Sequence, residues 1–326
     1  MAKLYYEKDA NLDALTGKRI AVVGYGIQGR AQALNLHDSR VDVVVGARPR
    51  GESWEAAQKD GLEVSEVGPA VRSADIVMML IPDEVQPEVY AADVGPNLRP
   101  GGTLDFAHGF NIRFGTIVPP KGIDVIMVAP KGPGAAVRET FLRGSGVPAL
   151  LAVHQDASGR ARSTALGIAK GLGATRVGVI ETTFTEEAES DLFGEQVDLC
   201  GGVAELIKAS FDVLVSNGYQ PELAYFEVLH ELKMIVDLIQ AGGIEHMWAS
   251  VSNTAEFGGR TRGPKVIDAA VRRNMEALLR DIKAGAFAKD WISEYKKGMP
   301  TLAKARKEAP ETPLERVGRD VRRMFT

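Results

Sequence analysis

Short apolar runs alternate with longer mixed segments over the first half of the chain. The runs are rich in β-branched residues: Ile20–Val23, Val41–Val45, Ile76–Ile81, Thr103–Phe106, Val125–Val128, Ala149–Val153 and Val177–Ile180. Several are uninterrupted, which is typical of parallel strands buried on both faces. Segments between them, such as Ile27–Leu36 and Ala161–Leu172, are long enough for crossover helices. The pattern predicts an α/β fold, a doubly wound parallel sheet of the Rossmann type with helices on both faces.

The pattern changes after Ile180. From Thr183 onward no segment reads convincingly as a strand, and apolar residues recur at helical spacing in Leu206–Val215, Leu223–Ile239, Val266–Ile282 and Leu314–Met324. We therefore expect two domains, a dinucleotide-binding domain over residues 1–182 and an all-helical domain over residues 183–326. Because the halves differ in structural class, we expect the chemistry to lie between them.

Composition and charge exclude few functions, but they indicate the general class of protein. The chain has 326 residues, 45% hydrophobic and 25% charged, as in ordinary soluble proteins. A formal net charge of −4 gives no reason to expect a nucleic acid or an anionic membrane as partner. The single cysteine, Cys200, cannot form an internal disulfide. The first residues lack the apolar core of a signal peptide, and no apolar run approaches the ~18–20 residues that span a bilayer. A cytoplasmic protein is the expectation.

A glycine-rich turn follows the first predicted strand and opens a helix. Its sequence, GYGIQG over Gly24–Gly29, has the G-x-G-x-x-G spacing in the strand–turn–helix setting that this motif requires. The glycines permit a tight turn and a close approach of the backbone to a pyrophosphate, and the helix N-terminus offers unpaired N–H groups to the phosphates. We expect cofactor contacts from Gly24, Tyr25, Gly26, Ile27, Gln28 and Gly29.

The loop after the second strand gives mixed signals on the cofactor. Arg48, Arg50 and Ser53 are suited to hold a 2′-phosphate, whereas Glu52 would repel one or accept ribose hydroxyls. The arginines could also simply face solvent. The sequence leaves NADPH and NADH both open, with Glu52 favouring tolerance of NADH. After the third strand, Asp83 and Gln86 are candidates to touch a ribose, with a helix cap by Asp83 as the plain alternative.

Two pairs of carboxylates have the spacing of neighbours on a helix face. Asp191 and Glu195 are four residues apart, as are Glu227 and Glu231. Both pairs lie among apolar residues rather than in a solvated charge run. Mg²⁺ prefers oxygen ligands, so two such helices facing each other would hold two Mg²⁺ ions. Glu227-x-x-His230 resembles half of a di-iron motif, which needs two copies, and His230 is interpreted as structural.

Three further side chains are candidates for the chemistry. Lys131 follows a strand in a Gly- and Pro-rich loop and could neutralise an oxyanion or stay a solvated loop charge, and we favour the first. His108 also follows a strand and is suited to cofactor or substrate contact and to proton transfer. Ser252 could bond a substrate carboxylate or only cap a helix. Cys200 is interpreted as a packing residue, since no basic residue flanks it.

Together these motifs resemble the signature blocks of ketol-acid reductoisomerases. The blocks GYGIQG, RAQALNL, DFAHGF, APKGPG, DLFGEQVDLCGG, YFEVLHELKMIVDLI and SNTAEFG occur in the family order from residue 24 to residue 258. The length is similar to the short form, which has one copy of the helical domain. Glu52 is the one departure in the cofactor loop, where many relatives have a small or neutral residue.

The resemblance implies specific roles. Asp191 and Glu195 would ligate Mg²⁺, and Glu227 and Glu231 would complete the site from the partner subunit of a homodimer whose helical domains are interlocked and knotted. Ser252 would bind the substrate carboxylate, Lys131 would approach the reacting oxygens, and His108 would be the active-site histidine. The cofactor would be lined by Tyr25 to Gln28, Arg48, Ser53, Asp83, Glu84, Val85, Gln86 and Gly134.

The reaction implied is conversion of 2-acetolactate to 2,3-dihydroxyisovalerate, and of the ethyl homologue to 2,3-dihydroxy-3-methylvalerate, with NADPH or NADH. Proton transfer could fall to Glu195, Glu231, Lys131 or a metal-bound water, which the sequence does not rank. Two alternatives stay open from the residues alone. A β-hydroxyacid dehydrogenase has the same plan without metal, and a non-catalytic NAD(P)-binding regulator would bind cofactor without turnover; both leave the acidic pairs without a role.

Overall fold

The computed structural model describes residues 2–324 and contains two compact units, Met1–Ala188 and Glu189–Thr326. We call them the sheet unit and the helical unit. The division falls inside helix α8 (Phe184–Gly194), so one continuous helix belongs to both.

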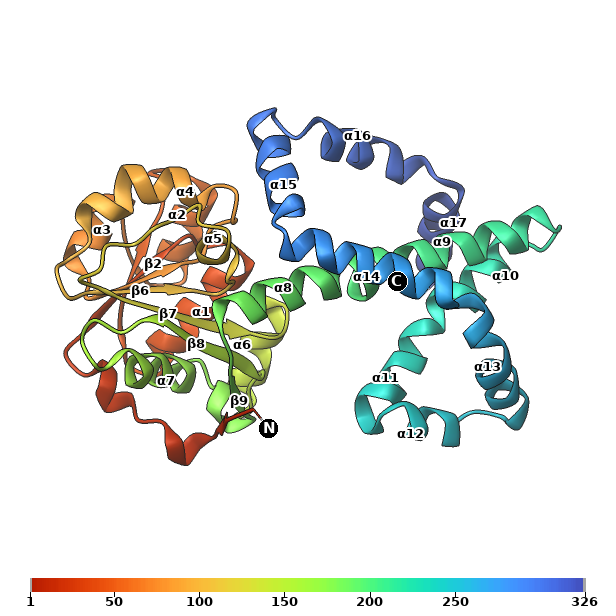
Figure 1. The fold of residues 1–326 in the computed structure, drawn as a ribbon, viewed down its shortest axis with the longest axis horizontal. Coiled ribbons are helices and arrows are strands. Elements are labelled where there is room, and N and C mark those ends of the chain that lie inside the picture. The colour runs from red at the N-terminus through yellow and green to blue at the C-terminus, as the bar shows by residue number, and fades with distance from the viewer. Residues whose placement is uncertain (1, 325–326) are drawn as a thin grey trace. The chain divides into compact units, whose positions relative to one another are not determined.

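A nine-stranded sheet forms the centre of the sheet unit, in the order β1-β9-β8-β7-β6-β5-β2-β3-β4 (Figure 1). Its strands are β1 Leu4–Tyr5, β2 Arg19–Val23, β3 Asp42–Gly46, β4 Glu63–Ser65, β5 Ile76–Met79, β6 Thr103–Phe106, β7 Asp124–Pro130, β8 Ala149–Gln155 and β9 Val179–Glu181. The runs expected from the sequence all form strands, with ends shifted by up to two residues. β1 and β4 were not foreseen, because two or three residues are too few to show a pattern.

The sheet is mixed, which corrects the expectation that it is parallel throughout. Parallel pairing joins β7, β6, β5, β2, β3 and β4 in turn. Antiparallel pairing joins β7 to β8 and β1 to β9. The reason lies in the β7–β8 connection. Helix α6 (Gly134–Leu142) and the following loop return the chain to the edge where β7 ends, so that Pro130 pairs with Ala149 and β8 must run back.

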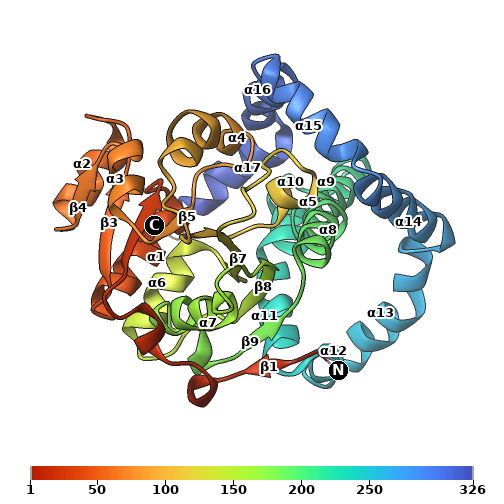
Figure 2. The same cartoon turned by 60° about the vertical axis from the view of Figure 1, so that its left-hand side comes forward.

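Two apolar cores cover the two faces of the sheet, as a doubly wound fold requires. One core joins the sheet to α1 (Ile27–Asp38), α2 (Glu52–Lys59) and α7 (Ala161–Gly171), and the other joins it to α3 (Val67–Ser73) and α5 (Phe110–Arg113). Figure 2 shows this layering from a second direction. The remaining helical pieces are η1 Glu7–Asp9, η2 Leu12–Leu15, α4 Gln86–Val89, η3 Tyr90–Val94, η4 Gly95–Asn97 and η5 Ala174–Arg176.

The strand order reverses between β2 and β5. From β2 the chain builds outward through β3 and β4, and from β5 it builds the other way through β6 and β7. In open α/β sheets the ligand crevice lies at such a reversal, outside the carboxyl ends of the strands. The glycine loop after β2 and the segment Leu80–Asp83 after β5 therefore meet at the expected ligand edge.

The helical unit contains only helices among its described residues 189–324. They are the end of α8, then η6 Glu195–Leu199, α9 Gly201–Ser216, α10 Pro221–Tyr225, η7 Phe226–His230, α11 Leu232–Gly242, α12 Ile244–Ala249, α13 Asn253–Val266, α14 Ala269–Lys283, α15 Ala286–Lys296, α16 Pro300–Glu308, η8 Ala309–Glu311 and α17 Pro313–Arg322. A small core of Phe211, Ala224, Tyr225, Leu314 and Val321 joins α9, α10 and α17. No helix within residues 2–324 combines the length and apolar character needed to span a bilayer.

Two of the predicted helices are interrupted. The segment Val266–Ile282 breaks at Asp268, whose side chain accepts hydrogen bonds from the N–H groups of Ala270 (2.8 Å) and Val271 (3.0 Å) and so begins α14 as an N-cap. The segment Leu223–Ile239 contains the π-helical turn η7. Apolar spacing alone foresaw neither break.

Asp105 is an unusual residue in the middle of β6. It is fully buried, and no hydrogen bond of ordinary geometry reaches either carboxylate oxygen from the described residues. Burial raises the pKa of this carboxyl well above its usual range, although the nearby backbone of Val128 and Phe106 opposes the rise. A raised folded-state pKa stabilises the protein below the unfolded pKa of about 3.9, and this stability is lost as the pH rises toward the folded value.

We therefore expect Asp105→Asn to remove this pH dependence. Its free energy of unfolding should exceed that of the wild type near pH 8 by about 1–3 kcal/mol, the usual cost of an unsatisfied buried polar group, with a smaller difference near pH 4. Denaturant unfolding across pH 4–8 measures it. Asp124→Asn is the matched control on β7, because Asp124 is also buried but accepts bonds from Ser158 N (2.9 Å) and Oγ (2.7 Å), and it should destabilise. Parallel curves for wild type and Asp105→Asn would contradict the interpretation.

Candidate active site

The glycine loop has the geometry of a phosphate cradle. Gly24 has φ +99°, and a Cβ there would lie 2.8 Å from the carbonyl oxygen of Leu80, while a Cβ on Gly29 would lie 2.3 Å from the carbonyl oxygen of Gly24. Both glycines are required by close backbone packing at the β2–β5 reversal. At Gly26, by contrast, a Cβ would meet nothing within 4 Å, so the loop leaves open space at the N-terminus of α1. The residues present fit a bound dinucleotide.

A cavity of about 710 Å³ opens beside this loop. Its walls include the expected cofactor residues Tyr25, Gly26, Ile27, Glu52, Ser53 and Gly134, together with Arg30 and Arg138, which the sequence reading did not single out. Arg48 is exposed and does not line the cavity. The structure thus brings Glu52 and the glycine loop to one cavity and leaves Arg48 outside it.

Helices α1 and α6 approach closely beside the glycine loop. A Cβ on Gly134 would lie 2.1 Å from the carbonyl oxygen of Ile27, and the side chain of Gln28 donates to the carbonyl of Gly132 (2.9 Å). The turn after β2 and the Gly- and Pro-rich loop after β7 are therefore held together. Lys131 lies in that second loop, with its backbone N–H bonded to Pro148 (2.8 Å).

Asp60 fixes the polar end of Tyr25. The Tyr25 hydroxyl donates to Asp60 (2.8 Å), and Arg30 donates twice to the same carboxylate (2.7 and 2.9 Å). Burial, with the Asp60 bond, raises the pKa of Tyr25 beyond its usual range, and the Arg30 bond lowers the pKa of Asp60. Tyr25 therefore stays protonated and immobile against the cavity. Asp60 lies more than thirty residues along the chain, with no motif to mark it.

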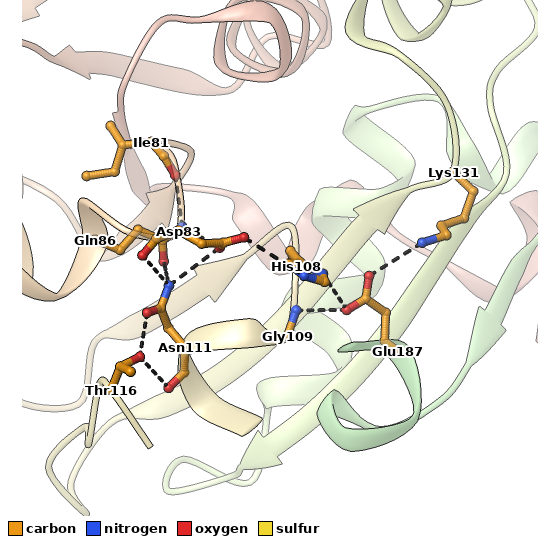
Figure 3. Close-up of polar contacts among 9 residues, drawn as sticks. All are labelled: Ile81, Asp83, Gln86, His108, Gly109, Asn111, Thr116, Lys131 and Glu187. Atoms are coloured by element: carbon orange, nitrogen blue, oxygen red, sulfur yellow. Dashed lines mark hydrogen bonds and ion pairs between the residues drawn. The ribbon is translucent and has the colours of Figure 1, made fainter. Parts of the chain in front are cut away.

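Glu187 is the centre of a polar cluster at the carboxyl edge of the sheet (Figure 3). Its side chain is 1% exposed, yet it accepts from Gly109 N–H (2.7 Å), lies 3.0 Å from His108 Nδ1 and 3.5 Å from Lys131 Nζ. A buried carboxylate needs such partners, because its desolvation is otherwise very costly. The cluster joins the loops after β6 and β7 to the first turn of α8 and brings together His108 and Lys131, two residues that the sequence singled out.

A second set of contacts extends the cluster toward β5. His108 Nε2 lies 3.9 Å from Asp83, and Asn111 donates to the carbonyl of Asp83 (3.1 Å) and to Gln86 Oε1 (3.0 Å). Gln86 is buried and also donates to the carbonyl of Ile81 (2.9 Å). The Gln86 side chain therefore stabilises the loop after β5, whereas Asp83 is partly exposed beside His108. Asp83 does not cap α4, whose N-cap is Val85.

A ladder of acids at a spacing of four residues runs along α8 to the start of η6. Glu187 and Asp191 lie in α8 and Glu195 is the first residue of η6, each about one turn after the last, so they share a face of the helix. The sequence reading found Asp191 and Glu195 but missed Glu187, although the same spacing extends back to it. Glu187 is buried, Asp191 is half-buried and Glu195 is exposed. The ladder thus runs from a fully partnered acid to one that faces solvent.

The second acidic pair lies in the helical unit beside the turn η7. Glu227 and Glu231 are both exposed, while His230 between them is half-buried with its ring 5.3 Å from that of Phe226. Ser252 is the N-cap of α13 and accepts from the N–H of Ala255 (3.2 Å). A serine hydroxyl that accepts this bond keeps its own hydrogen to donate elsewhere. Ser252 therefore caps α13, and its hydroxyl hydrogen can still be donated to a substrate.

Comparisons with known proteins agree with this geometry. Residues 14–178 match the family model of the acetohydroxy acid isomeroreductase NADPH-binding domain, and residues 184–326 match that of the ketol-acid reductoisomerase C-terminal domain. The chain belongs to the ketol-acid reductoisomerase family. Ketol-acid reductoisomerase (NADP(+)) of Pyrobaculum calidifontis is 60% identical over 325 residues, covering 100% of this chain and 99% of that protein.

A solved structure gives the same fold. The NADH-preferring ketol-acid reductoisomerase from an uncultured archean superposes with a TM-score of 0.97 and 46% identity over 99% of each chain. As a member of this family, the protein is an NAD(P)H-dependent oxidoreductase. The NADPH-binding model spans the glycine loop and every residue that lines the cavity beside it.

Replacing Glu187 tests the cluster. In Glu187→Gln the amide cannot hold both His108 and Lys131 as the carboxylate does, so we expect turnover to fall roughly 10- to 100-fold, as when residues that orient a reacting group are lost. Binding of NADPH, measured by fluorescence titration, should be unchanged. Glu186→Gln is the control, because Glu186 is exposed on the same helix turn and accepts only from Thr182 (2.8 Å). Equal activity in both variants would show that Glu187 has only a packing role.

Proposed function

We propose that the protein converts 2-acetolactate to 2,3-dihydroxyisovalerate, and the ethyl homologue to 2,3-dihydroxy-3-methylvalerate. In the first step the tertiary hydroxyl at C2 loses its proton, and the alkyl group moves with its bonding electrons to C3. C2 becomes a ketone and the C3 oxygen becomes a hydroxyl. A hydride and a proton then reduce the C2 ketone. The observation that carries the proposal is the acidic ladder of α8, which begins at the His108–Glu187–Lys131 cluster.

The donor set fits two Mg²⁺ ions. Asp191, Glu195, Glu227 and Glu231 offer only carboxylate oxygens, which hard cations prefer over nitrogen or sulfur ligands. We propose that these four residues hold the ions. When bound, the ions would polarise the substrate's oxygen atoms and favour loss of the hydroxyl proton.

Residues of the sheet unit would manage charge and protons. Glu187 contacts His108 at Nδ1, and Nε2 of the same ring would exchange a proton during the reaction. The same carboxylate restrains the ammonium of Lys131, which would donate a hydrogen bond to a substrate oxygen as negative charge develops. Ser252 would donate its hydroxyl hydrogen to the substrate carboxylate.

We propose that both NADPH and NADH serve as reductant. The nicotinamide would supply the hydride for the C2 ketone. Relatives named for NADP(+) and a structure named as NADH-preferring both resemble this chain closely. Glu52 lies at the first position of α2, in the cavity wall, where its charge opposes a 2′-phosphate and can accept ribose hydroxyls.

We further propose that the active unit is a homodimer in which Glu227 and Glu231 act on the partner's site. The support is the apolar surface of the helical unit, where Leu199, Val213, Ile244 and Phe257 are each more than half exposed. Apolar surface of this kind marks interaction sites when it is contiguous. A second copy of the chain would cover it.

Cofactor oxidation with 2-acetolactate tests the reaction. Absorbance at the nicotinamide band should fall only when enzyme, 2-acetolactate and Mg²⁺ are all present, and excess EDTA should abolish it, because the carboxylates alone cannot polarise the ketone. 3-Hydroxyisobutyrate with NADP⁺ is the control for a metal-independent dehydrogenase. Absence of oxidation with either cofactor, in protein that still binds nucleotide and Mg²⁺, would reject the proposed function.

Replacing Glu52 tests the cofactor proposal. In Glu52→Gln a charge that opposes the 2′-phosphate is removed, so the ratio of kcat/KM for NADPH to that for NADH should rise roughly 5- to 50-fold, corresponding to about 1–2 kcal/mol of charge interaction. Glu55→Gln, an exposed acid one turn later in α2 and outside the cavity wall, is the control and should leave the ratio unchanged. A ratio that stays constant in Glu52→Gln would place the discrimination elsewhere.

A further inference from the structure

Two π-helical turns lie at the predicted metal-binding carboxylates. Glu195 begins the turn η6, which closes with Cys200 N–H bonded to the carbonyl of Glu195 (3.2 Å). Glu227 lies in η7, which closes with Glu231 N–H bonded to the carbonyl of Phe226 (3.1 Å). Each bond spans five residues rather than four, so each turn contains one residue more than an α-helical turn.

The first π turn depends on two glycines that follow it. A Cβ on Gly201 would lie 2.2 Å from the carbonyl oxygen of Gln196, and a Cβ on Gly202 would lie 2.0 Å from that of Val197. These neighbours are backbone atoms and cannot rotate aside as a flexible side chain would. By contrast, a Cβ on Gly258 or Gly263 in α13 would meet nothing within 4 Å. A side chain at position 201 or 202 would therefore collide with the backbone of η6, whereas positions 258 and 263 of α13 have room for one.

The extra residue determines the direction of the acids on α8. One residue corresponds to about 100° of rotation around a helix, so removing the π turn without removing a residue would rotate α8 by that angle relative to α9. Helix α9 cannot follow, because Phe211 is 1% exposed in the core with Tyr225 and Leu314. Asp191 and Glu195 would then point to another side of the helical unit.

We infer that Gly201 and Gly202 are positioning residues of the carboxylate site. Neither residue has a side chain that could bind a metal or a substrate. By accommodating the π turn they set the rotational phase between α8, which carries Asp191 and leads into Glu195, and α9, which is anchored in the core. This inference rests on the proposed function, in which those carboxylates bind Mg²⁺.

The test is Mg²⁺ binding by the full chain, measured by calorimetry at a temperature well below unfolding. Gly201→Ala should weaken Mg²⁺ binding roughly 10- to 100-fold, as for residues that orient metal ligands. Its helix content by circular dichroism should be retained. Gly263→Ala is the matched control, the same change in a helix with free space, and should alter the dissociation constant less than about twofold.

A deletion separates positioning from stability. Removing Asp198, an exposed residue of η6, should convert the π turn to an α turn while keeping the phase of α9. Asp198 deletion combined with Gly201→Ala should therefore restore Mg²⁺ binding to within about threefold of the wild type, since the Cβ no longer meets the carbonyl. A mere packing defect would not be rescued in this way.

The outcomes distinguish this inference from the proposed function. If the wild-type protein binds no Mg²⁺, the proposed function fails and the inference fails with it. If the wild type binds Mg²⁺ and Gly201→Ala binds it equally well, only the inference is overturned. If Gly201→Ala weakens binding but the deletion does not rescue it, the glycines act through stability and the positioning role is likewise overturned.

Discussion

The organisation of the site depends on one buried charge, the carboxylate of Glu187. An acid that is almost completely removed from water must find donors, since leaving it unpaired would cost several kcal/mol. The donors are Gly109 N–H, His108 and Lys131, which come from the ends of two neighbouring strands. The requirement to satisfy this charge therefore places a histidine, a lysine and the first turn of α8 together. The close approach also needs Gly109 to lack a side chain, because a Cβ there would lie 2.5 Å from the carbonyl of Phe184.

Glycine makes close backbone contacts possible at three further points. Gly24 and Gly29 allow the turn after β2 to pack against the end of β5, Gly134 allows α6 to approach α1, and Gly201 with Gly202 allows the π turn after Glu195. At each point the lack of a side chain allows two backbone segments to pack closely. The position of the backbone then determines where the neighbouring polar groups lie. Cofactor cavity, lysine loop and carboxylate helix are thus positioned by the same physical means.

The sequence predicted the fold where its patterns extend over many residues. Alternation of buried strands and helices indicated the doubly wound sheet, and spacing indicated the glycine loop. It did not predict the antiparallel β8, because strand direction depends on where a connecting loop returns the chain. Nor did it foresee η7, since a π turn changes the phase of a helix without changing its composition. The comparisons confirmed the family that the motifs resembled.

Within the candidate site, local motifs singled out Lys131, His108 and the acidic pairs as candidates, but the contacts that His108 and Lys131 make could not be predicted. Glu187 lies 79 residues from His108, and Asp60 lies 35 residues from Tyr25. Pairs so distant meet only through the tertiary fold, and neither acid is part of a motif. Glu187 lies four residues before Asp191, and this helical spacing pointed to it. Surface acids have the same spacing, so the signal is not specific to a site.

Glu187 and Asp105 show how burial alone does not determine what an acid does. Both are within a few residues of the carboxyl edge of the sheet, and both are almost fully buried. Glu187 has three donors, so its charge is held and used to orient other groups. No described residue donates a hydrogen bond of ordinary geometry to Asp105, so burial favours its neutral form and its proton is retained to higher pH. A buried carboxyl group with several donors, such as Glu187, keeps its charge and orients its neighbours. A buried carboxyl group without such donors among the described residues, such as Asp105, is neutral and destabilises the fold.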